Sequence, residues 1–117
     1  MPRKRNIVPI IALLALGGCA ASKPSTDQMG QAVVAIRDAE QAEAVSMAPV
    51  PMRTARDAYS RAEEAERGQQ YLLASRLAEE AIVDAKLATA TAQAERARLS
   101  LDEMRRSQDA LRREATH

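Results

Sequence analysis

Alanine recurs at steps of three and four residues along three consecutive segments of this chain, and no other feature limits its possible folds so strongly. The three series are Ala32, Ala35, Ala39 and Ala42; Ala55, Ala58, Ala62 and Ala65; and Ala74, Ala78, Ala81, Ala85, Ala88 and Ala92. This spacing places each series on one face of an α-helix. The chain has no Trp and no Phe, and burial of one small apolar group stabilises a fold by only about 0.8 kcal/mol. We therefore expect an all-α fold, an antiparallel alanine-rich helical hairpin or three-helix bundle whose helices approach closely.

Local signals set the expected boundaries of the first two helices. Ser25 and Gln28 have the spacing of a capping box, which predicts a first helix from Thr26 to Met47. Pro49 ends that helix, because proline disfavours helical geometry at the preceding residue. Pro51 suits the first turn of a second helix.

The third helix is expected to be by far the longest. Gly68 predicts the end of the second helix as a left-handed C-cap. No Gly or Pro follows Gln70, so a third helix is expected from there to about Glu114. Three larger apolar residues are expected to widen its buried face: Leu77, Ile82 and Leu87.

The C-terminal half of the third helix is expected to project beyond the bundle, because the whole helix is about 67 Å long at 1.5 Å per residue. A seam in this half continues the steps of four and three: Ala97, Leu101, Met104, Gln108, Leu111 and Ala115. The seam predicts a coiled-coil surface for a protein partner or for self-association, flanked by Arg105, Arg106, Arg112 and Arg113. The alternative is a frayed and solvated helix end, since an isolated polar helix is marginally stable.

The N-terminal segment has the features of an export signal. Basic residues 3–5 precede an apolar run, residues 7–16, which is shorter than the roughly 20 residues of a membrane span. The run ends in Leu16-Gly17-Gly18-Cys19, which resembles the lipobox of bacterial lipoproteins. The resemblance implies cleavage between Gly18 and Cys19, lipidation of Cys19, and, with Ala20 next, anchoring in the outer membrane facing the periplasm. The alternatives for Cys19 are a buried small side chain or a free thiol.

The expected organisation has four parts: a signal peptide (1–18), a lipidated tether (19–25), an alanine-rich helical domain (26–94) and a C-terminal helical extension (95–117). Removal of residues 1–18 would leave fourteen basic and sixteen acidic residues, a net charge of −2. Nucleic-acid-binding proteins carry a strong basic excess. The charge therefore argues against nucleic acid as a partner.

One stretch resembles a known bacterial family. It reads Ala55-x-x-Ala58-Tyr59-x-x-Ala62-x-x-Ala65-x-x-Gly68-x-x-Tyr71-x-x-Ala74-x-x-Leu77-Ala78-x-x-Ala81, and it is similar to the family called domain of unknown function 4398. Met47-Ala48-Pro49 and Asp84-Ala85-x-x-Ala88 also fit, so the resemblance covers most of residues 29–100. It implies an envelope lipoprotein or periplasmic protein, and it carries over no catalytic residue.

The sequence suggests no catalytic, cofactor or metal site. The single histidine, His117, is the last residue of the sequence, and paired carboxylates such as Glu63-Glu64 lie opposite the alanine faces. Carboxylates that precede arginines by four are typical of exposed helices, as in Asp57 with Arg61 and Asp102 with Arg106. We therefore expect a protein that is not an enzyme, a membrane-anchored interaction or scaffold module. The alternative is a helical protein that binds a small ligand or lipid, which would need a pocket lined by large apolar residues.

Overall fold

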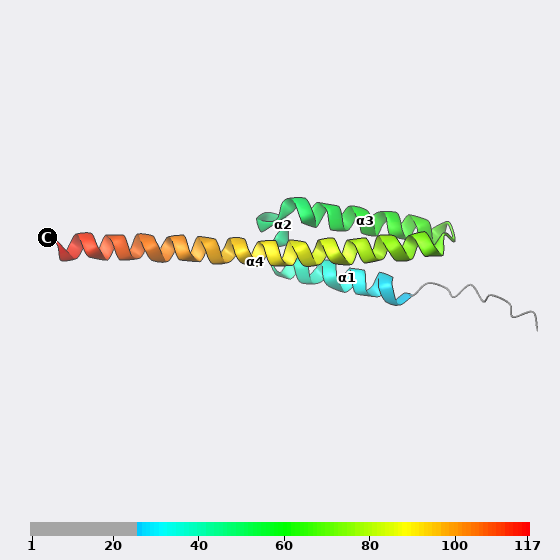
Figure 1. Ribbon diagram of the computed structural model, residues 1–117, viewed down its shortest axis with the longest axis horizontal. Coiled ribbons are helices and arrows are strands. Elements are labelled where there is room, and N and C mark those ends of the chain that lie inside the picture. The colour runs from blue at the N-terminus through cyan, green and yellow to red at the C-terminus, as the bar shows by residue number, and fades with distance from the viewer. Residues whose placement is uncertain (1–25) are drawn as a thin grey trace, which may run out of the picture.

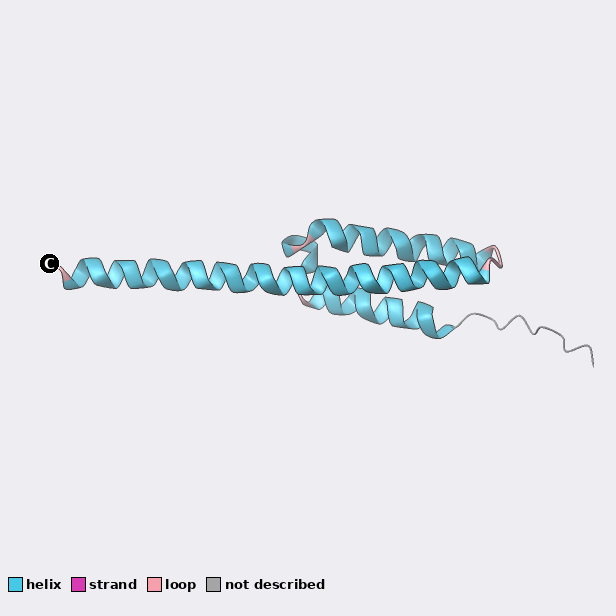
Figure 2. Ribbon diagram, viewed as in Figure 1, coloured by secondary structure: helices cyan, strands magenta, loops and turns pink. Residues whose placement is uncertain are grey.

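The computed structural model describes residues 26–117, and every secondary-structure element among them is a helix (Figures 1 and 2). The elements are α1 (Thr26–Gln41), α2 (Ala44–Met47), α3 (Pro49–Arg67) and α4 (Tyr71–Ala115). The fold is therefore all-α, as predicted. The signal segment, Cys19 and the proposed cap at Ser25 lie outside the described residues.

The three longer helices form an up-down-up bundle in which α4 lies against both α1 and α3 (Figure 1). Ala32 of α1 packs with Ala62 of α3 and Ala78 of α4. Further along, Ala39 of α1 packs with Ala55 of α3 and with alanines nearer the middle of α4. Consequently α1 and α4 run in the same direction, and α3 runs antiparallel to both.

The core consists almost entirely of methyl groups, as the alanine spacing predicts. The buried alanines include Ala32, Ala35, Ala39, Ala55, Ala58, Ala62, Ala65, Ala74, Ala78, Ala81, Ala85, Ala88 and Ala92. Among the described residues Met52 is the largest fully buried side chain, and it belongs to the cluster that α1, α2 and α3 form with the middle of α4. No buried polar side chain occurs among residues 26–117. Apart from Met52, every buried side chain among the described residues is an alanine, so stability depends on close contact of many small groups.

The predicted continuous helix from Thr26 to Met47 is wrong, because the chain turns after Gln41 and forms the one-turn helix α2. Glu43 adopts a left-handed conformation with φ 62°, and its backbone N–H donates to the Glu40 carbonyl at 3.0 Å. The turn places Ala44 and Ala48 in the core. Burial of these two methyl groups accompanies a conformation that is otherwise unfavourable for glutamate.

The proline break is confirmed, and Pro51 lies in the first turn of α3, as predicted. Ala48 leaves the helical region with φ −141°, as expected for a residue before proline. Pro49, and not Pro51, is the first residue of α3. Both prolines fit in the first turn, where backbone N–H groups have no partner inside the helix.

The turn between α3 and α4 differs from the prediction at one residue. Gly68 has φ −78°, and the left-handed residue is Gln69 with φ 59°. The N–H of Gln69 donates to the Glu66 carbonyl at 3.0 Å, and the N–H of Gln70 donates to the Ala65 carbonyl at 2.8 Å. This is the Schellman hydrogen-bond pattern, with Gln69 in the position that glycine usually occupies.

Polar contacts connect the helices around the alanine core. The Arg56 guanidinium of α3 lies 2.7 Å from the Glu40 carboxylate of α1. The Arg61 guanidinium lies 3.3 Å from Glu80 of α4 and 3.7 Å from Asp57, which confirms the predicted Asp57–Arg61 pair.

The start of α1 is bonded to α4 by Gln28. Its side-chain amide donates to Glu79 at 2.5 Å and accepts from the Ser75 hydroxyl. The first turn of α1 therefore lies beside the start of α4.

Candidate interaction surface

The C-terminal half of α4 projects beyond the bundle, as predicted (Figure 1). The buried face of α4 ends at Ala92, whereas the helix continues to Ala115, a further 35 Å or so at 1.5 Å per residue. The helix crosses the expected domain boundary at residue 94 without interruption. At its base the Arg96 guanidinium lies 2.9 Å from the Glu43 carboxylate, and beyond Arg96 this half has no hydrogen bond or ion pair with another described helix.

The seam predicted for this half is exposed along its length. Leu101, Met104 and Leu111 are 47%, 62% and 64% exposed, and Ala97, Gln108 and Ala115 are also exposed. Exposure of several large apolar side chains in a regular series is the usual mark of an interaction site.

The structure shows that this exposed face begins earlier, within the bundle. Val83 and Leu87 are 65% and 54% exposed, and Ala90 and Ala94 are exposed as well. They continue the steps of four and three to give what we call the outer seam: Val83, Leu87, Ala90, Ala94, Ala97, Leu101, Met104, Gln108, Leu111 and Ala115. This seam covers about 33 residues, more than four heptads.

The expectation that Leu87 widens the buried face is wrong, and helix geometry gives the reason. Leu87 follows the buried Ala85 by two residues, a rotation of roughly 200° about the helix axis. The other bundle residues of the outer seam have the same relation to buried alanines, as Val83 has to Ala81. The outer seam therefore faces away from the core. The repeated spacing in the sequence was the signal for it, but the interleaved alanine series concealed that signal.

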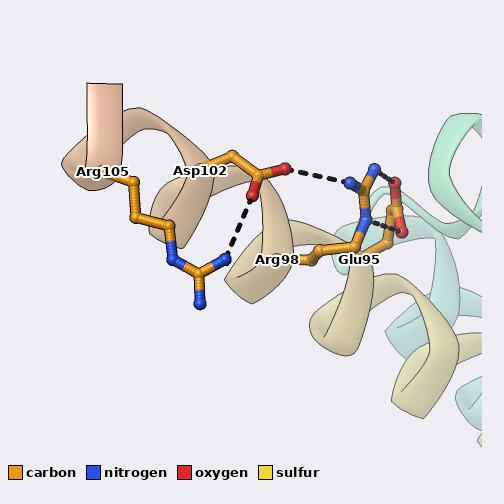
Figure 3. Close-up of polar contacts among 4 residues, drawn as sticks. All are labelled: Glu95, Arg98, Asp102 and Arg105. Atoms are coloured by element: carbon orange, nitrogen blue, oxygen red, sulfur yellow. Dashed lines mark hydrogen bonds and ion pairs between the residues drawn. The ribbon is translucent and has the colours of Figure 1, made fainter. Parts of the chain in front are cut away.

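A series of ion pairs runs along one side of the projecting half (Figure 3). The Arg98 guanidinium lies 2.5 Å from the Glu95 carboxylate and 3.0 Å from Asp102. Arg105 continues the series at 4.0 Å from Asp102. The hydrogen bond from Arg98 lowers the pKa of Glu95 below its ordinary value and raises the pKa of Arg98. These contacts, at spacings of three and four, stabilise an exposed helix.

Two of the grooves between the described helices of the bundle are lined by α1. The larger has a volume of about 540 Å³ and is open to solvent between α1 and α4, where Val34 and Ile82 lie near Asp38 and Lys86. The smaller lies between α1 and α3, beside Tyr59. Partial burial and the nearby carboxylates of Glu63 and Glu66 raise the pKa of Tyr59. Both grooves carry charged side chains on their walls.

The structure describes only some of the other residues considered in the sequence. Glu63 and Glu64 are exposed at consecutive positions of α3, His117 is exposed after the end of α4, and Gly18 and Cys19 are outside the described residues. No cluster of side chains suited to a metal ion occurs between residues 26 and 117. Within the same range, no helix combines the length and apolarity of a membrane span.

Comparison with known proteins identifies one family. It is described as a domain of unknown function (DUF4398), and it matches residues 27–104. The matched region includes the whole bundle and the first part of the projecting half of α4. No curated protein and no solved structure matches the chain.

Proposed function

We propose that this chain, which belongs to the family described as a domain of unknown function (DUF4398), is a non-catalytic interaction module of the bacterial envelope. In this proposal Cys19 carries the lipid anchor after cleavage at Gly18, and the protein is held at the outer membrane facing the periplasm. Its projecting helix presents the outer seam to a protein. The observation that carries the proposal is the long apolar face left exposed on an ordered helix.

The arrangement of the bundle separates the start of α1 from the projecting half of α4. Thr26, which follows the tether, begins α1 at the same end of the bundle as the turn between α3 and α4 (Figure 1). The free part of α4 leaves from the opposite end. In this proposal the lipid at Cys19 and the projecting half of α4 therefore lie toward opposite ends of the bundle.

The alternative of a small-ligand or lipid-binding protein has less support. Pockets for such ligands are lined mainly by large apolar side chains with a few polar groups. The groove between α1 and α4 is lined by Val34, Ala35 and Ile82 together with Asp27, Asp38 and Lys86. This mixture of apolar and charged groups is more typical of a water-filled groove or of a contact surface for another protein than of a small-ligand pocket.

Metabolic labelling with an alkyne fatty acid tests the anchor. We expect label on the wild-type chain and none on Cys19→Ala, with the wild type in the membrane fraction and the variant in the soluble periplasmic fraction. A single acyl chain binds membranes weakly, whereas two or three anchor stably. Equal labelling of the two proteins would refute the lipid anchor.

Envelope cross-linking of a shortened chain tests the interaction surface. The chain should end after Leu99, because removal of Arg96 would also remove a contact with the turn after α1. The matched full-length control carries Leu101→Glu and Leu111→Glu, which keep the helix but interrupt the outer seam. We expect both variants to lose the cross-linked products of the wild type. Retention of those products by both would exclude the seam as the interaction surface.

A further inference from the structure

We propose that the outer seam pairs with the outer seam of a second copy of this chain, as an antiparallel coiled coil centred near residue 99. This inference rests on the proposed function and deepens it by naming the partner. The observation behind it is the distribution of charges beside the seam.

Two rows of residues flank the outer seam. Each residue of the first row comes directly after every second residue of the seam, beginning with Val83. This row is Asp84, Thr91, Arg98, Arg105 and Arg112. Each residue of the second row comes directly before one of the remaining seam residues, beginning with Leu87. This row is Lys86, Gln93, Ser100, Ser107 and Glu114. In a parallel pair each row faces the other row of the second helix, whereas in an antiparallel pair each row faces itself.

Only the antiparallel arrangement brings opposite charges together. With the centre near residue 99, Asp84 faces Arg112 of the second copy, and Lys86 faces Glu114 of the second copy. Each contact occurs twice by symmetry, so that four ion pairs close the two ends of the interface. In a parallel pair the three arginines of the first row would face Gln93, Ser100 and Ser107, which carry no charge.

The register is set by the same charges. A shift of one heptad in one direction brings Arg98 against Arg105 of the second copy. A shift in the other direction removes the contact between Lys86 and Glu114. The first shift brings like charges together and keeps neither type of ion pair, and the second keeps only the contacts of Asp84, now with Arg105 of the second copy. Both shifts therefore leave fewer ion pairs than the proposed register.

The one like-charge contact in the proposed register lies at the centre, where Arg98 faces Arg98 of the second copy. This guanidinium is already bonded to Glu95 and Asp102 within its own helix (Figure 3). The two carboxylates offset its charge. The ion pairs of the projecting half therefore prepare it for the centre of the interface.

Side-chain sizes along the seam are also complementary in this register. Met104 faces Ala94 and Leu101 faces Ala97, so a large residue meets a small one, as close packing requires. Leu87 faces Leu111 near each end. Gln108 faces Ala90, and a single polar residue in such a seam favours one register over others.

The bundle leaves this face of α4 accessible. Ile82 of α4 lines the groove beside α1, and Leu77 lines the groove beside α3, both on the sides of the alanine stripe. The outer seam lies nearly opposite that stripe, by roughly 200° of rotation. A second helix can therefore lie along α4 without displacing α1 or α3.

Thiol cross-linking tests the direction and the register together. Cys19 is the only cysteine, so residues 19–117 carrying Cys19→Ala provide a cysteine-free background. In the proposed pair Ser100 faces Ser100 of the second copy, whereas the two copies of Ser107 are about 21 Å apart along the axis. Both serines are exposed and occupy equivalent flanking positions.

With a short bis-maleimide reagent, we expect Ser100→Cys to form covalent dimers at least tenfold faster than Ser107→Cys. Equal rates for the two variants would overturn the antiparallel pair, because a parallel pair or random collision treats the two positions alike. The helix content of both variants, measured by circular dichroism, serves as the control for folding.

A charge exchange tests the ion pairs in the same background. We expect Arg112→Glu to weaken self-association about tenfold in sedimentation equilibrium, and Arg112→Glu combined with Asp84→Lys to restore it. Failure of the combined variant to recover would overturn the register. Purified protein is used throughout, so a monomer with intact envelope cross-links would refute this inference alone and leave the proposed function standing.

Discussion

The guanidinium of Arg96 lies 2.9 Å from the carboxylate of Glu43, although 53 residues separate them in the sequence. Arg96 also donates to the backbone carbonyl of Ala42 at 3.4 Å. It thus binds the C-terminal end of α1, where the carbonyl groups carry partial negative charge. The contact lies where α4 leaves the bundle, so it connects the last turn of the bundle to the base of the projecting half.

Arg96→Ala is expected to lower the free energy of unfolding by about 1 kcal/mol, because it removes a half-exposed ion pair and a helix-end contact. The measurement is urea denaturation followed by circular dichroism. Arg106→Ala is the matched control on the same helix, and a change within about 0.5 kcal/mol is expected for it as an exposed substitution. If both variants lose the same stability, the contact at the end of α1 contributes nothing.

Ala62→Asp and Ala78→Asp are expected to destabilise the bundle by about 4 kcal/mol or more, because each buries a charge without a partner. Both alanines are fully buried in the cluster shared by α1, α3 and α4. Thermal unfolding measures the effect. The outward substitution Glu64→Ala should change the midpoint little, and a comparable loss at all three positions would contradict a packed alanine core.

Gln69→Gly is expected to stabilise the protein by about 0.5–1 kcal/mol, since glycine accepts a positive φ without the penalty of a Cβ atom. Gly68→Ala should be neutral or slightly stabilising, because its φ is ordinary and the added Cβ would lie 3.5 Å from the Glu64 carbonyl. Chemical denaturation measures both. A large loss for Gly68→Ala would mean that Gly68, and not Gln69, is the left-handed residue.

The carboxyl of Glu95 is expected to titrate below its ordinary pKa of 4.5, because Arg98 donates hydrogen bonds to its charged form. Because folding lowers the pKa of Glu95, its ionised carboxylate stabilises the helix when the pH is above the pKa of the unfolded chain. This contribution is lost as the pH falls through the lowered pKa of the folded chain. A side-chain NMR titration measures the midpoint, and Arg98→Ala should move it back toward 4.5. An unchanged midpoint in that variant would exclude Arg98 as the cause.

Much of the fold followed from the sequence alone, because the relevant forces act between residues close together in the chain. Alanine spacing identified the buried face of each helix, the residue before Pro49 marked a break, and the absence of Gly and Pro after Gln70 predicted one long helix. These are effects of helix propensity, proline geometry and helical periodicity. The same periodicity located the exposed seam from Ala97 to Ala115.

Only the tertiary structure revealed the positions at which long-range packing overrides the local conformational preference of a residue. Glu43 and Gln69 adopt left-handed conformations that neither residue favours. Packing of Ala44 and Ala48 against the middle of α4 accompanies the first, and packing of Ala78 and Ala81 against α1 and α3 accompanies the second. Met52 precedes Ala55 by three residues and so continues the buried face of α3, but only the tertiary structure made it the largest fully buried side chain among residues 26–117. The assignment of Leu87 to the core failed because two apolar series interleave on α4, and only the positions of α1 and α3 determine which series is covered. The spacing of three and four residues is the same for every face of a helix. Which face of α4 is buried is therefore determined by the helices that pack against it.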